Sequence, residues 1–483
     1  MLDQENLTET EVASRTYSLV VIGAGVAGLN ALYAAVQYLP KGAQVLLLDQ
    51  KDAAGGMWNT AYDYVHLHQP HPMFTVGDMK WNWQKPAEYL AARDEVQSHL
   101  ASSLPKVRET ADLETQFGTT VVSCEEITTP FGPKARVTFH PNGDPDDVIV
   151  VEADRAIFAS GLNYRRASPL QLSSQAVVSI VTQDLKPTLS ANPDAPVCVV
   201  GGGKTGMDTI LAVLAENPGR EVSLIKGRGT NFFNRTKFLP NGLKRWTSGR
   251  LVSRLFHDLA INFDGDNEDH TISYFRANYS TDPDTENGVF LYGLQSEDEN
   301  RRVKDGLAYE YADYLEDVVD GPDGPQIVLR SGETQNLAAG TIVVNCTGSF
   351  FRGAFDAAHQ CLSPGGAVLH INARDGFHFL TSVCGFFVTH LLYRDALRGK
   401  GFYTLDHEAL FRQNRNAWIG ASAAQAYLNQ TIAVQNLPMM LLDKCGLDLD
   451  RWYPFPRRMA ALIKMKSNAK ADIAPVSYTH LRA

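Results

Sequence analysis

The sequence predicts an α/β fold built from two doubly wound parallel sheets, with the second inserted into the chain of the first. A glycine-rich turn follows a short apolar strand and opens a helix at residues 19–36, and the same arrangement recurs at 197–215. A later apolar strand at 341–345 suggests that the chain returns to its first domain. These three observations place both glycine turns where parallel sheets bind ligands, at the carboxyl ends of strands.

Length and composition are those of a multidomain globular protein. The 483 residues are 44% hydrophobic, enough for two or three domains. The net charge of -10 argues against a nucleic-acid partner, which needs a concentrated basic surface. The acidic, polar N-terminal sequence lacks a secretion signal, and no uncharged segment reaches membrane-spanning length. We therefore expect a cytoplasmic protein without membrane or nucleic-acid partners.

The first glycine-rich turn fits the phosphates of a dinucleotide. Gly23 permits the tight turn, Gly25 lets the backbone approach a pyrophosphate, and Gly28 lets helix and strand pack closely. The helix N-terminus adds free N–H groups and a partial positive charge. Asp49 ends the next strand, 49 − 23 = 26 residues on, where a carboxylate accepts hydrogen bonds from ribose hydroxyls. The alternative is a chance turn with a surface aspartate.

The second glycine-rich turn contains Gly201, Gly203 and Gly206 between a strand and a helix. It includes Gly-Lys-Thr but is no Walker A loop, because Cys198 stands where the first glycine should be. Two turns of this kind predict two bound dinucleotides.

The residues that end the following strand indicate which nucleotide the second turn binds. Lys226 lies 226 − 201 = 25 residues after Gly201, with Arg228 close behind. A carboxylate there would repel the 2′-phosphate of NADPH, whereas lysine and arginine would pair with it. The alternative is a solvated basic turn. The pattern favours NADPH.

A third motif, Gly55-Gly56-Met57-Trp58, follows Asp49 by a few residues. Two glycines let the backbone pass close to a flat ligand, and Trp58 is placed to cover it. The alternative is a simple loop with a core tryptophan.

The strand-end acid followed by Gly-Gly-x-Trp resembles the flavin-containing and Baeyer–Villiger monooxygenase superfamily, in which this sequence lies against FAD. The resemblance spans most of the chain and includes both turns in order, with hinge-like segments at 159–161 and 346–348. It implies that the first turn, with Gly56 and Trp58, binds FAD and the second binds NADPH.

One signature of that superfamily is missing. The F-x-G-x-x-x-H motif should precede the second turn, but residues 177–196 contain neither phenylalanine nor histidine. The chain is therefore expected to be an outlying member.

With this resemblance, four segments are predicted. Residues 1–180 form the first part of the FAD-binding domain, and 190–335 form the NAD(P)H-binding domain with loop insertions. Residues 336–475 return to the FAD domain and add C-terminal helices. Residues 476–483 differ in composition and are expected to be a tail or a sequence artefact without function.

Three histidines, His66, His68 and His71, follow the Gly-Gly-x-Trp loop. We predict no metal, because Pro70 interrupts their alternation and no acid or cysteine completes a site. Their position instead suggests that His68 or Gln69 hydrogen-bonds the flavin and takes part in catalysis. The alternative, histidines satisfied by backbone groups, is equally compatible.

These features predict an NADPH-reduced, FAD-dependent oxidoreductase. The resemblance implies a monooxygenase that transfers one oxygen atom of O2 to a small organic substrate through a C4a-peroxyflavin. A substrate pocket at His68, Gln69 and the aromatic pair Phe350-Phe351 is one hypothesis. Neither the substrate nor the oligomeric state can be predicted from the sequence.

Other flavoprotein classes remain open. A disulfide reductase needs a redox cysteine pair beside the flavin, yet no cysteine lies between Gly28 and Cys124. An NAD(P)H dehydrogenase or reductase and a non-catalytic flavin-binding protein are the further alternatives. The six scattered cysteines are expected to be reduced thiols.

Overall fold

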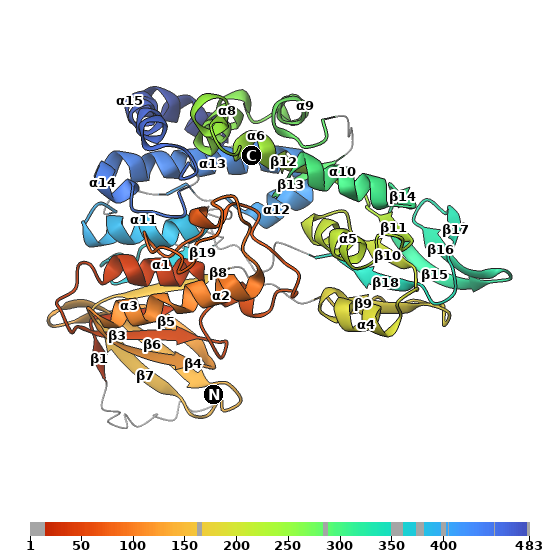
Figure 1. Ribbon diagram of the computed structural model, residues 1–483. Helices are drawn as coiled ribbons and strands as arrows, with labels where there is room; N and C mark the ends of the chain where they lie inside the picture. The colour runs from red at the N-terminus through yellow and green to blue at the C-terminus, as the bar shows by residue number, and fades with distance from the viewer. Residues whose placement is uncertain are drawn as a thin grey trace, which may run out of the picture. The chain divides into compact units, whose positions relative to one another are not determined.

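The chain, seen as a computed structural model in Figure 1, divides into two compact units. Unit 1 consists of residues 1–59, 100–161 and 358–402, and unit 2 of residues 60–99, 162–357 and 403–483. The structure describes residues 15–161, 167–283, 288–348, 361–372, 381–397, 402–403, 405–448 and 450–480.

Unit 1 is built on a five-stranded parallel sheet. Its strand order is β19 (Val368–Asn372), β8 (Ala156–Gly161), β2 (Leu19–Ile22), β3 (Gln44–Asp49) and β4 (Asp112–Phe117). Strands β2 and β3 are continuous apolar runs, as expected for strands covered on both faces. Helix α1 (Val26–Ala35) connects them, and α3 (Ser103–Arg108) precedes β4. This sheet is the first of the two that the sequence predicts.

Helix α11 (Thr381–Tyr393) lies against α1 in unit 1 (Figure 1). A Cβ atom on Gly385 would stand 2.1 Å from the carbonyl oxygen of Ala27, so the two backbones approach too closely for any side chain at this position. Segments that lie far apart in the sequence therefore complete the first domain together.

A second sheet of unit 1 has the strand order β1 (Thr16–Tyr17), β7 (Ile149–Ala153), β6 (Gly132–Pro141) and β5 (Thr119–Thr129). Inward residues of β6, such as Val137 and Phe139, are fully buried with Val20 and Leu46 of the parallel sheet. The two sheets thus share one core.

Unit 2 contains the second five-stranded parallel sheet. Its order is β14 (Tyr309–Tyr311), β11 (Val222–Ile225), β10 (Val197–Val200), β18 (Ile342–Asn345) and β9 (Val178–Val181). Helix α5 (Lys204–Glu216) joins β10 to β11, and η3 (Thr182–Asp184) and α4 (Leu185–Ala191) follow β9. With two such sheets, the predicted fold class is confirmed.

The position of β18 corrects one prediction. The strand at 341–345 was expected to return the chain to the first domain, but Ile342 pairs with Val197 in the second sheet. The chain returns to unit 1 only within residues 358–402. A short apolar strand fits either parallel sheet, so its partner is decided by tertiary contacts that a local pattern does not contain.

The remaining strands of unit 2 form two small sheets. One is the antiparallel set β15 (Leu315–Gly321), β16 (Gly324–Leu329) and β17 (Thr334–Asn336), and the other pairs β12 (Thr230–Asn234) with β13 (Val289–Gln295). Short helices follow β12 at α6 (Arg235–Phe238) and α7 (Lys244–Thr247), and α10 (Glu297–Gly306) follows β13.

A helical part completes unit 2. It comprises α8 (Val252–Asn262), α9 (Glu268–Tyr279), α12 (His407–Gln413), α13 (Arg415–Asn436), α14 (Met439–Leu442) and α15 (Phe455–His480). The C-terminal helices were predicted to belong to the FAD domain; instead they pack in unit 2, where Tyr292 of β13 donates a hydrogen bond to the carbonyl oxygen of Ile419. Helix α15 continues to His480, into the stretch predicted as a tail.

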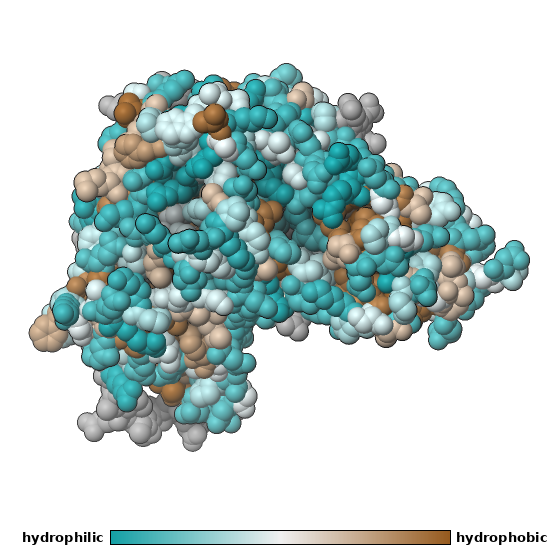
Figure 2. Space-filling view, in the orientation of Figure 1, coloured by the Kyte–Doolittle hydropathy of each residue, from teal (hydrophilic) through white to brown (hydrophobic). Residues whose placement is uncertain are grey.

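Hydrophilic residues cover most of the face shown in Figure 2. Within the described parts of the chain, none of the helices is both long and apolar enough to cross a membrane.

Candidate dinucleotide-binding sites

The first glycine turn has the strained geometry that only glycine tolerates. Gly23, directly after β2, has φ of +107°, and a Cβ atom there would stand 2.3 Å from the carbonyl oxygen of Ala159. A Cβ atom on Gly28 would stand 1.8 Å from the carbonyl oxygen of Gly23. Both glycines are therefore required for the tight turn and for the packing of α1 on the sheet.

Gly25 caps α1 at its N-terminus without a side-chain acceptor. Its backbone is extended (φ -81°, ψ -178°), and the first turn of α1 contains no acidic residue. The N–H groups that open the helix are therefore not engaged by a side-chain cap and carry the positive end of the helix dipole.

Asp49 and the Gly-Gly-x-Trp loop both lie against this turn. Asp49 accepts hydrogen bonds from the backbone N–H groups of Ala24 (2.5 Å) and Lys51 (2.7 Å). Gly56, in the 3-10 helix η1 (Gly56–Asn59), has φ of +59°, and a Cβ atom there would stand 2.7 Å from the Cα atom of Gly25. The structure therefore brings together the predicted acid, turn and loop.

Trp58 is buried, with 8% of its surface exposed. Burial of the ring agrees with the core-tryptophan alternative as well as with a residue that covers a ligand.

The second turn repeats the geometry of the first. Gly201, directly after β10, has φ of +122°, and Gly203 caps α5 with φ of -82° and ψ of -178°. A Cβ atom on Gly206 would stand 2.0 Å from the carbonyl oxygen of Gly201. No side chain caps α5, and its first turn contains no acidic residue. Two anion-accepting helix N-termini are thus built in the same way.

The space beside Gly203 supports the fit of a ligand there. Among the described residues other than its chain neighbours Gly202 and Lys204, no atom lies within 4 Å of a Cβ atom built on Gly203. A diphosphate can therefore approach this backbone, while Gly201 and Gly206 are closed in by protein atoms. The residues of both turns fit the phosphates of a dinucleotide.

Lys226 lies beside the second turn, as the sequence predicts. A Cβ atom on Gly202 would stand 2.7 Å from the carbonyl oxygen of Lys226. The Lys226 ammonium pairs at 2.8 Å with Glu310, which β14 places next to β11. Arg228 is exposed and forms no ion pair within the described residues.

Glu310 was missed because nothing in the sequence indicates that its strand pairs with β11. Its carboxylate compensates part of the positive charge of Lys226, the charge that would favour the 2′-phosphate of NADPH.

The histidine segment belongs to unit 2, together with the second turn. His66 donates through Nδ1 to the carbonyl oxygen of Tyr64 at 3.0 Å, and His71 through Nδ1 to that of Tyr89 at 3.2 Å. His71 opens the 3-10 helix η2 (His71–Met73) and is buried. These contacts are those of the alternative in which backbone groups satisfy the imidazoles. Of the residues described, no cluster of histidine, cysteine and acidic side chains could hold a metal ion.

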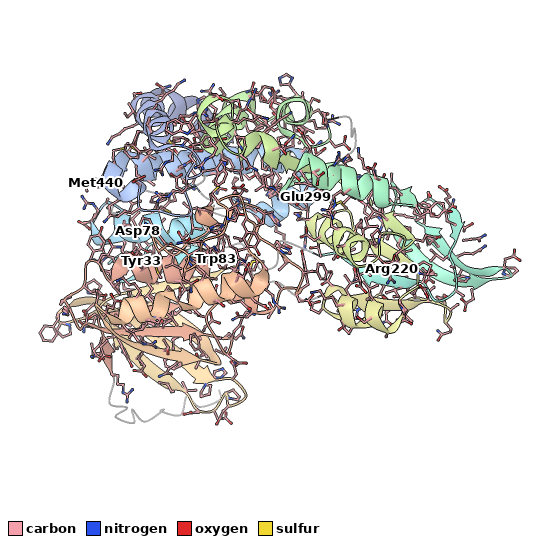
Figure 3. All side chains as sticks on the ribbon, in the orientation of Figure 1. Tyr33, Asp78, Trp83, Arg220, Glu299 and Met440 are labelled. Atoms are coloured by element: carbon pink, nitrogen blue, oxygen red, sulfur yellow. The ribbon has the colours of Figure 1, made fainter. Side chains whose placement is uncertain are left out.

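His68 lies among four charged side chains near α5. Burial and the positive charge of Lys204 lower the pKa of His68 to about 4, so its imidazole is neutral at physiological pH. Lys204 pairs with Asp208, and Arg235 pairs with Glu299 at 2.7 Å. Figure 3 marks Glu299 on α10. Arg235 also donates to the carbonyl oxygen of His68 at 3.2 Å.

Gln69 is partly buried and makes no hydrogen bond within the described parts of the chain. Phe350 and Phe351, the other residues of the predicted substrate pocket, lie outside the described residues.

Tyr62 and Tyr64 attach the histidine segment to α5, a connection that the sequence analysis missed. Tyr62 donates to Asp208 at 2.9 Å, and the hydroxyl groups of Tyr64 and Thr209 are 2.8 Å apart. Asp208 and Thr209 are adjacent on α5, so the histidine segment lies along this helix. The sequence offers no signal for such a long-range pairing.

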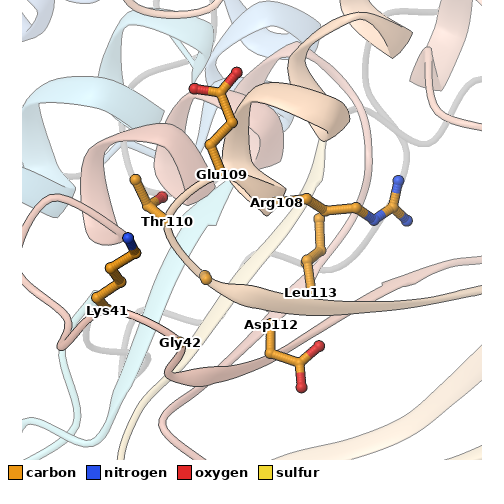
Figure 4. Close-up of a pocket in the computed structure, with 8 residues that line it drawn as sticks. Lys41, Gly42, Arg108, Glu109, Thr110, Asp112 and Leu113 are labelled. Carbon is orange, nitrogen blue, oxygen red and sulfur yellow. The ribbon is translucent and has the colours of Figure 1, made fainter.

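Two cavities have linings that include no residue of either glycine turn. One, of about 460 Å³ (Figure 4), is lined by Lys41, Arg108 and neighbouring residues that precede β3 and β4. It is therefore at the amino ends of these strands, opposite to the edge where parallel sheets bind nucleotides. The other, of about 530 Å³ in unit 2, is lined by Pro70, Arg235 and Lys244 among others. Pro70 and Arg235 place it close to the histidine segment.

Comparison with known proteins agrees with this architecture. The family model for pyridine nucleotide-disulphide oxidoreductase matches residues 17–237, a range that contains both glycine turns. No curated protein matches the chain. With both parallel sheets, this match confirms the predicted FAD/NAD(P)-binding fold and the oxidoreductase class.

Several solved structures are similar to the chain at low sequence identity. The ornithine hydroxylase from Pseudomonas aeruginosa in its reduced form has 13% identity and a TM-score of 0.48, covering 79% of this chain and 99% of its own. The FAD-bound cadaverine monooxygenase from Erwinia amylovora has 14% identity and a TM-score of 0.49, and the match covers 81% of this chain and 97% of that protein. The flavin-containing monooxygenase from Stenotrophomonas maltophilia has 16% identity and a TM-score of 0.46, with coverage of 79% and 98%.

Proposed function

We propose that the chain is an NADPH-dependent flavoprotein monooxygenase that transfers one oxygen atom of O2 to a small organic substrate. NADPH and a proton would reduce the second oxygen atom to water, which balances the reaction. The observation that supports this proposal most directly is the pair of equivalent turns, Gly23–Gly28 and Gly201–Gly206, on separate sheets.

The residues of each turn have distinct roles in this proposal. The N–H groups that open α1 hold the FAD diphosphate, and Asp49 orients the ribose beside it. The N–H groups that open α5 hold the NADPH diphosphate, while Lys226 and Arg228 bind its 2′-phosphate. Bound FAD would supply the redox chemistry, accepting a hydride and delivering electrons to O2.

His68 is proposed to act as a neutral hydrogen-bonding group in unit 2, beside the second turn. Its low pKa excludes a role as a cationic acid at neutral pH. Gln69 follows it and is retained as a substrate- or flavin-contacting candidate.

The cysteines favour oxygen chemistry over disulfide reduction. Four of the described cysteine side chains form no disulfide: Cys124, Cys198, Cys346 and Cys445. Burial raises the pKa of Cys198 to about 11 and that of Cys346 to about 12, so neither is a ready thiolate. The unpaired thiols also suit the cytoplasm, where we place the protein.

Rapid-mixing absorbance spectroscopy of the purified flavoprotein tests the proposal. We expect NADPH to bleach the flavin anaerobically, and O2 then to restore it with product formed from one member of an amine, sulfide and ketone panel. Bleaching followed only by hydrogen peroxide, whatever the compound, would favour the dehydrogenase or reductase alternative. No bleaching would favour a non-catalytic flavin-binding protein.

A further inference from the structure

The two glycine turns differ in the first residue of the helix that follows. Helix α1 begins with Val26, whereas α5 begins with Lys204 at the equivalent position. A cation at a helix N-terminus is unfavourable, because the helix dipole already places partial positive charge there. The Lys204 side chain is also only 14% exposed, so solvent does little to offset this repulsion.

Asp208 compensates the charge of Lys204. The two side chains form an ion pair one helical turn apart, and the Asp208 side chain is 12% exposed. Asp208 also accepts a hydrogen bond from the hydroxyl of Tyr62 at 2.9 Å. An i,i+4 pair with the lysine on the N-terminal side is the less favourable orientation on a helix. Helix stability alone therefore gives little reason for a lysine at this position.

The position of Lys204 and Asp208 in α5 suggests a role in binding the nucleotide. Lys204 directly follows Gly203, and apart from these two residues and Gly202 no described atom lies within 4 Å of a Cβ atom built on Gly203. Asp208 lies about 6 Å from Lys204 along the helix axis, since each residue rises 1.5 Å. This separation is within the reach of a lysine side chain that turns from Asp208 to the helix N-terminus. Asp208 would keep its hydrogen bond from Tyr62 after such a change.

We propose that Lys204 binds the diphosphate of the pyridine dinucleotide and that Asp208 holds its ammonium group until the nucleotide arrives. On binding, the Lys204 ammonium group would leave the Asp208 carboxylate and pair with the diphosphate, which carries two negative charges. The N–H groups that open α5 would bind oxygens of the same diphosphate. This inference rests on the proposed function, because it requires a pyridine dinucleotide at the second turn. It assigns to Lys204 a role distinct from that of Lys226, which faces the 2′-phosphate.

The two roles predict different patterns of binding. NAD+ and NADP+ share the diphosphate, so Lys204→Met should raise the dissociation constants of both by a similar factor, about tenfold. Lys226→Met should weaken NADP+ alone. 2′-AMP carries a phosphate on the ribose but no diphosphate, so its affinity should fall in Lys226→Met and stay unchanged in Lys204→Met.

Isothermal titration calorimetry on the FAD-loaded full chain measures these constants without turnover. Lys237→Met is a matched control, because Lys237 is exposed and forms no ion pair within the described residues. If Lys204→Met does not fold, Lys204→Gln replaces it and retains a hydrogen bond to Asp208. Asp208→Asn should lower the dissociation constants of both dinucleotides by about two- to fivefold, since it removes the competing charge.

The outcomes separate this inference from the function on which it rests. Wild-type protein that binds NAD+ or NADP+ while Lys204→Met binds them equally well would overturn the role of Lys204. Loss of NADP+ binding alone in Lys204→Met would also overturn it, because Lys204 would then read the 2′-phosphate. Wild-type protein that binds neither dinucleotide would instead refute the proposed function.

Discussion

The two glycine turns share a backbone but differ in the residues around it. Gly25 and Gly203 cap their helices with almost identical dihedral angles. At the first turn, however, Asp49 accepts a backbone hydrogen bond from the turn itself, whereas Lys226 stands beside the second. The comparison supports our proposal that the turn provides a general site for a diphosphate, while the residue at the end of the next strand selects the nucleotide.

The largest expected effect on nucleotide binding comes from replacing the last glycine of each turn by alanine. Gly28→Ala should abolish flavin content, because its Cβ atom meets the carbonyl oxygen of Gly23 at 1.8 Å. In Gly206→Ala the new Cβ atom would stand 2.0 Å from the carbonyl oxygen of Gly201. This variant should lose NADP+ binding but retain its flavin. Each should also destabilise its unit by about 1–3 kcal/mol or more. Flavin absorbance per chain, NADP+ titration and thermal unfolding measure these effects.

Gly203→Ala is the matched control for steric damage. Its new methyl group meets no atom within 4 Å among the described residues other than its two chain neighbours, and φ of -82° suits alanine. We therefore expect an unchanged unfolding temperature but at least about tenfold weaker NADP+ binding, because the methyl group fills the space of the diphosphate. Wild-type affinity in this variant would show that the diphosphate does not lie there.

A smaller effect, on the preference between NADPH and NADH, is expected from the basic residues beside the second turn. Replacement of Lys226 and Arg228 by alanine should reduce the preference for NADPH over NADH by about 10- to 100-fold, through loss of charge-assisted hydrogen bonds. Glu310→Gln should strengthen NADPH binding by about two- to threefold, since it removes the carboxylate paired with Lys226. Steady-state kcat/KM values for both nucleotides measure this. An unchanged ratio in the double alanine variant would contradict the assignment of these residues.

The last effect concerns the stability of unit 2 rather than nucleotide binding, and it depends on pH. Four described histidines whose pKa is lowered, mainly by burial, lie in unit 2: His68, His71, His99 and His407. The pKa of His407 is lowered to about 4, and its Nδ1 accepts a hydrogen bond from Trp418 at 3.1 Å, so it is neutral when folded. The unfolded state therefore takes up a proton first as the pH falls below about 6.5.

The contribution of His407 is thus fully present above pH 6.5 and is lost as the pH falls towards 4, by at most about 3 kcal/mol. His407→Gln should flatten this part of the stability profile, which chemical unfolding at several pH values measures. Equal slopes in the wild type and the variant would contradict a buried, neutral imidazole.

The local parts of this account could be predicted from the sequence. Both glycine turns, Asp49 and the position of Lys226 follow from short patterns in which strand, turn and helix are adjacent in the chain. The i,i+4 spacing of Lys204 and Asp208 is equally local, although its meaning became clear only from the burial of both side chains.

The parts that depend on distant segments could not be predicted. The strand at 341–345 has the same apolar pattern whichever sheet it joins, and nothing near His68 indicates that its segment lies along α5. Glu310 reaches Lys226 only because β14 pairs with β11. In each case the partner lies more than 80 residues away, and a local pattern holds no information about it.

Simultaneous occupancy of the two turns is the central claim, and a titration of the FAD-loaded chain with NADP+ tests it most directly. We expect NADP+ to bind at a single site per chain while the flavin stays bound, and Gly206→Ala to remove that binding with no loss of flavin. Release of flavin as NADP+ binds would contradict the claim, since the two nucleotides would then share one site.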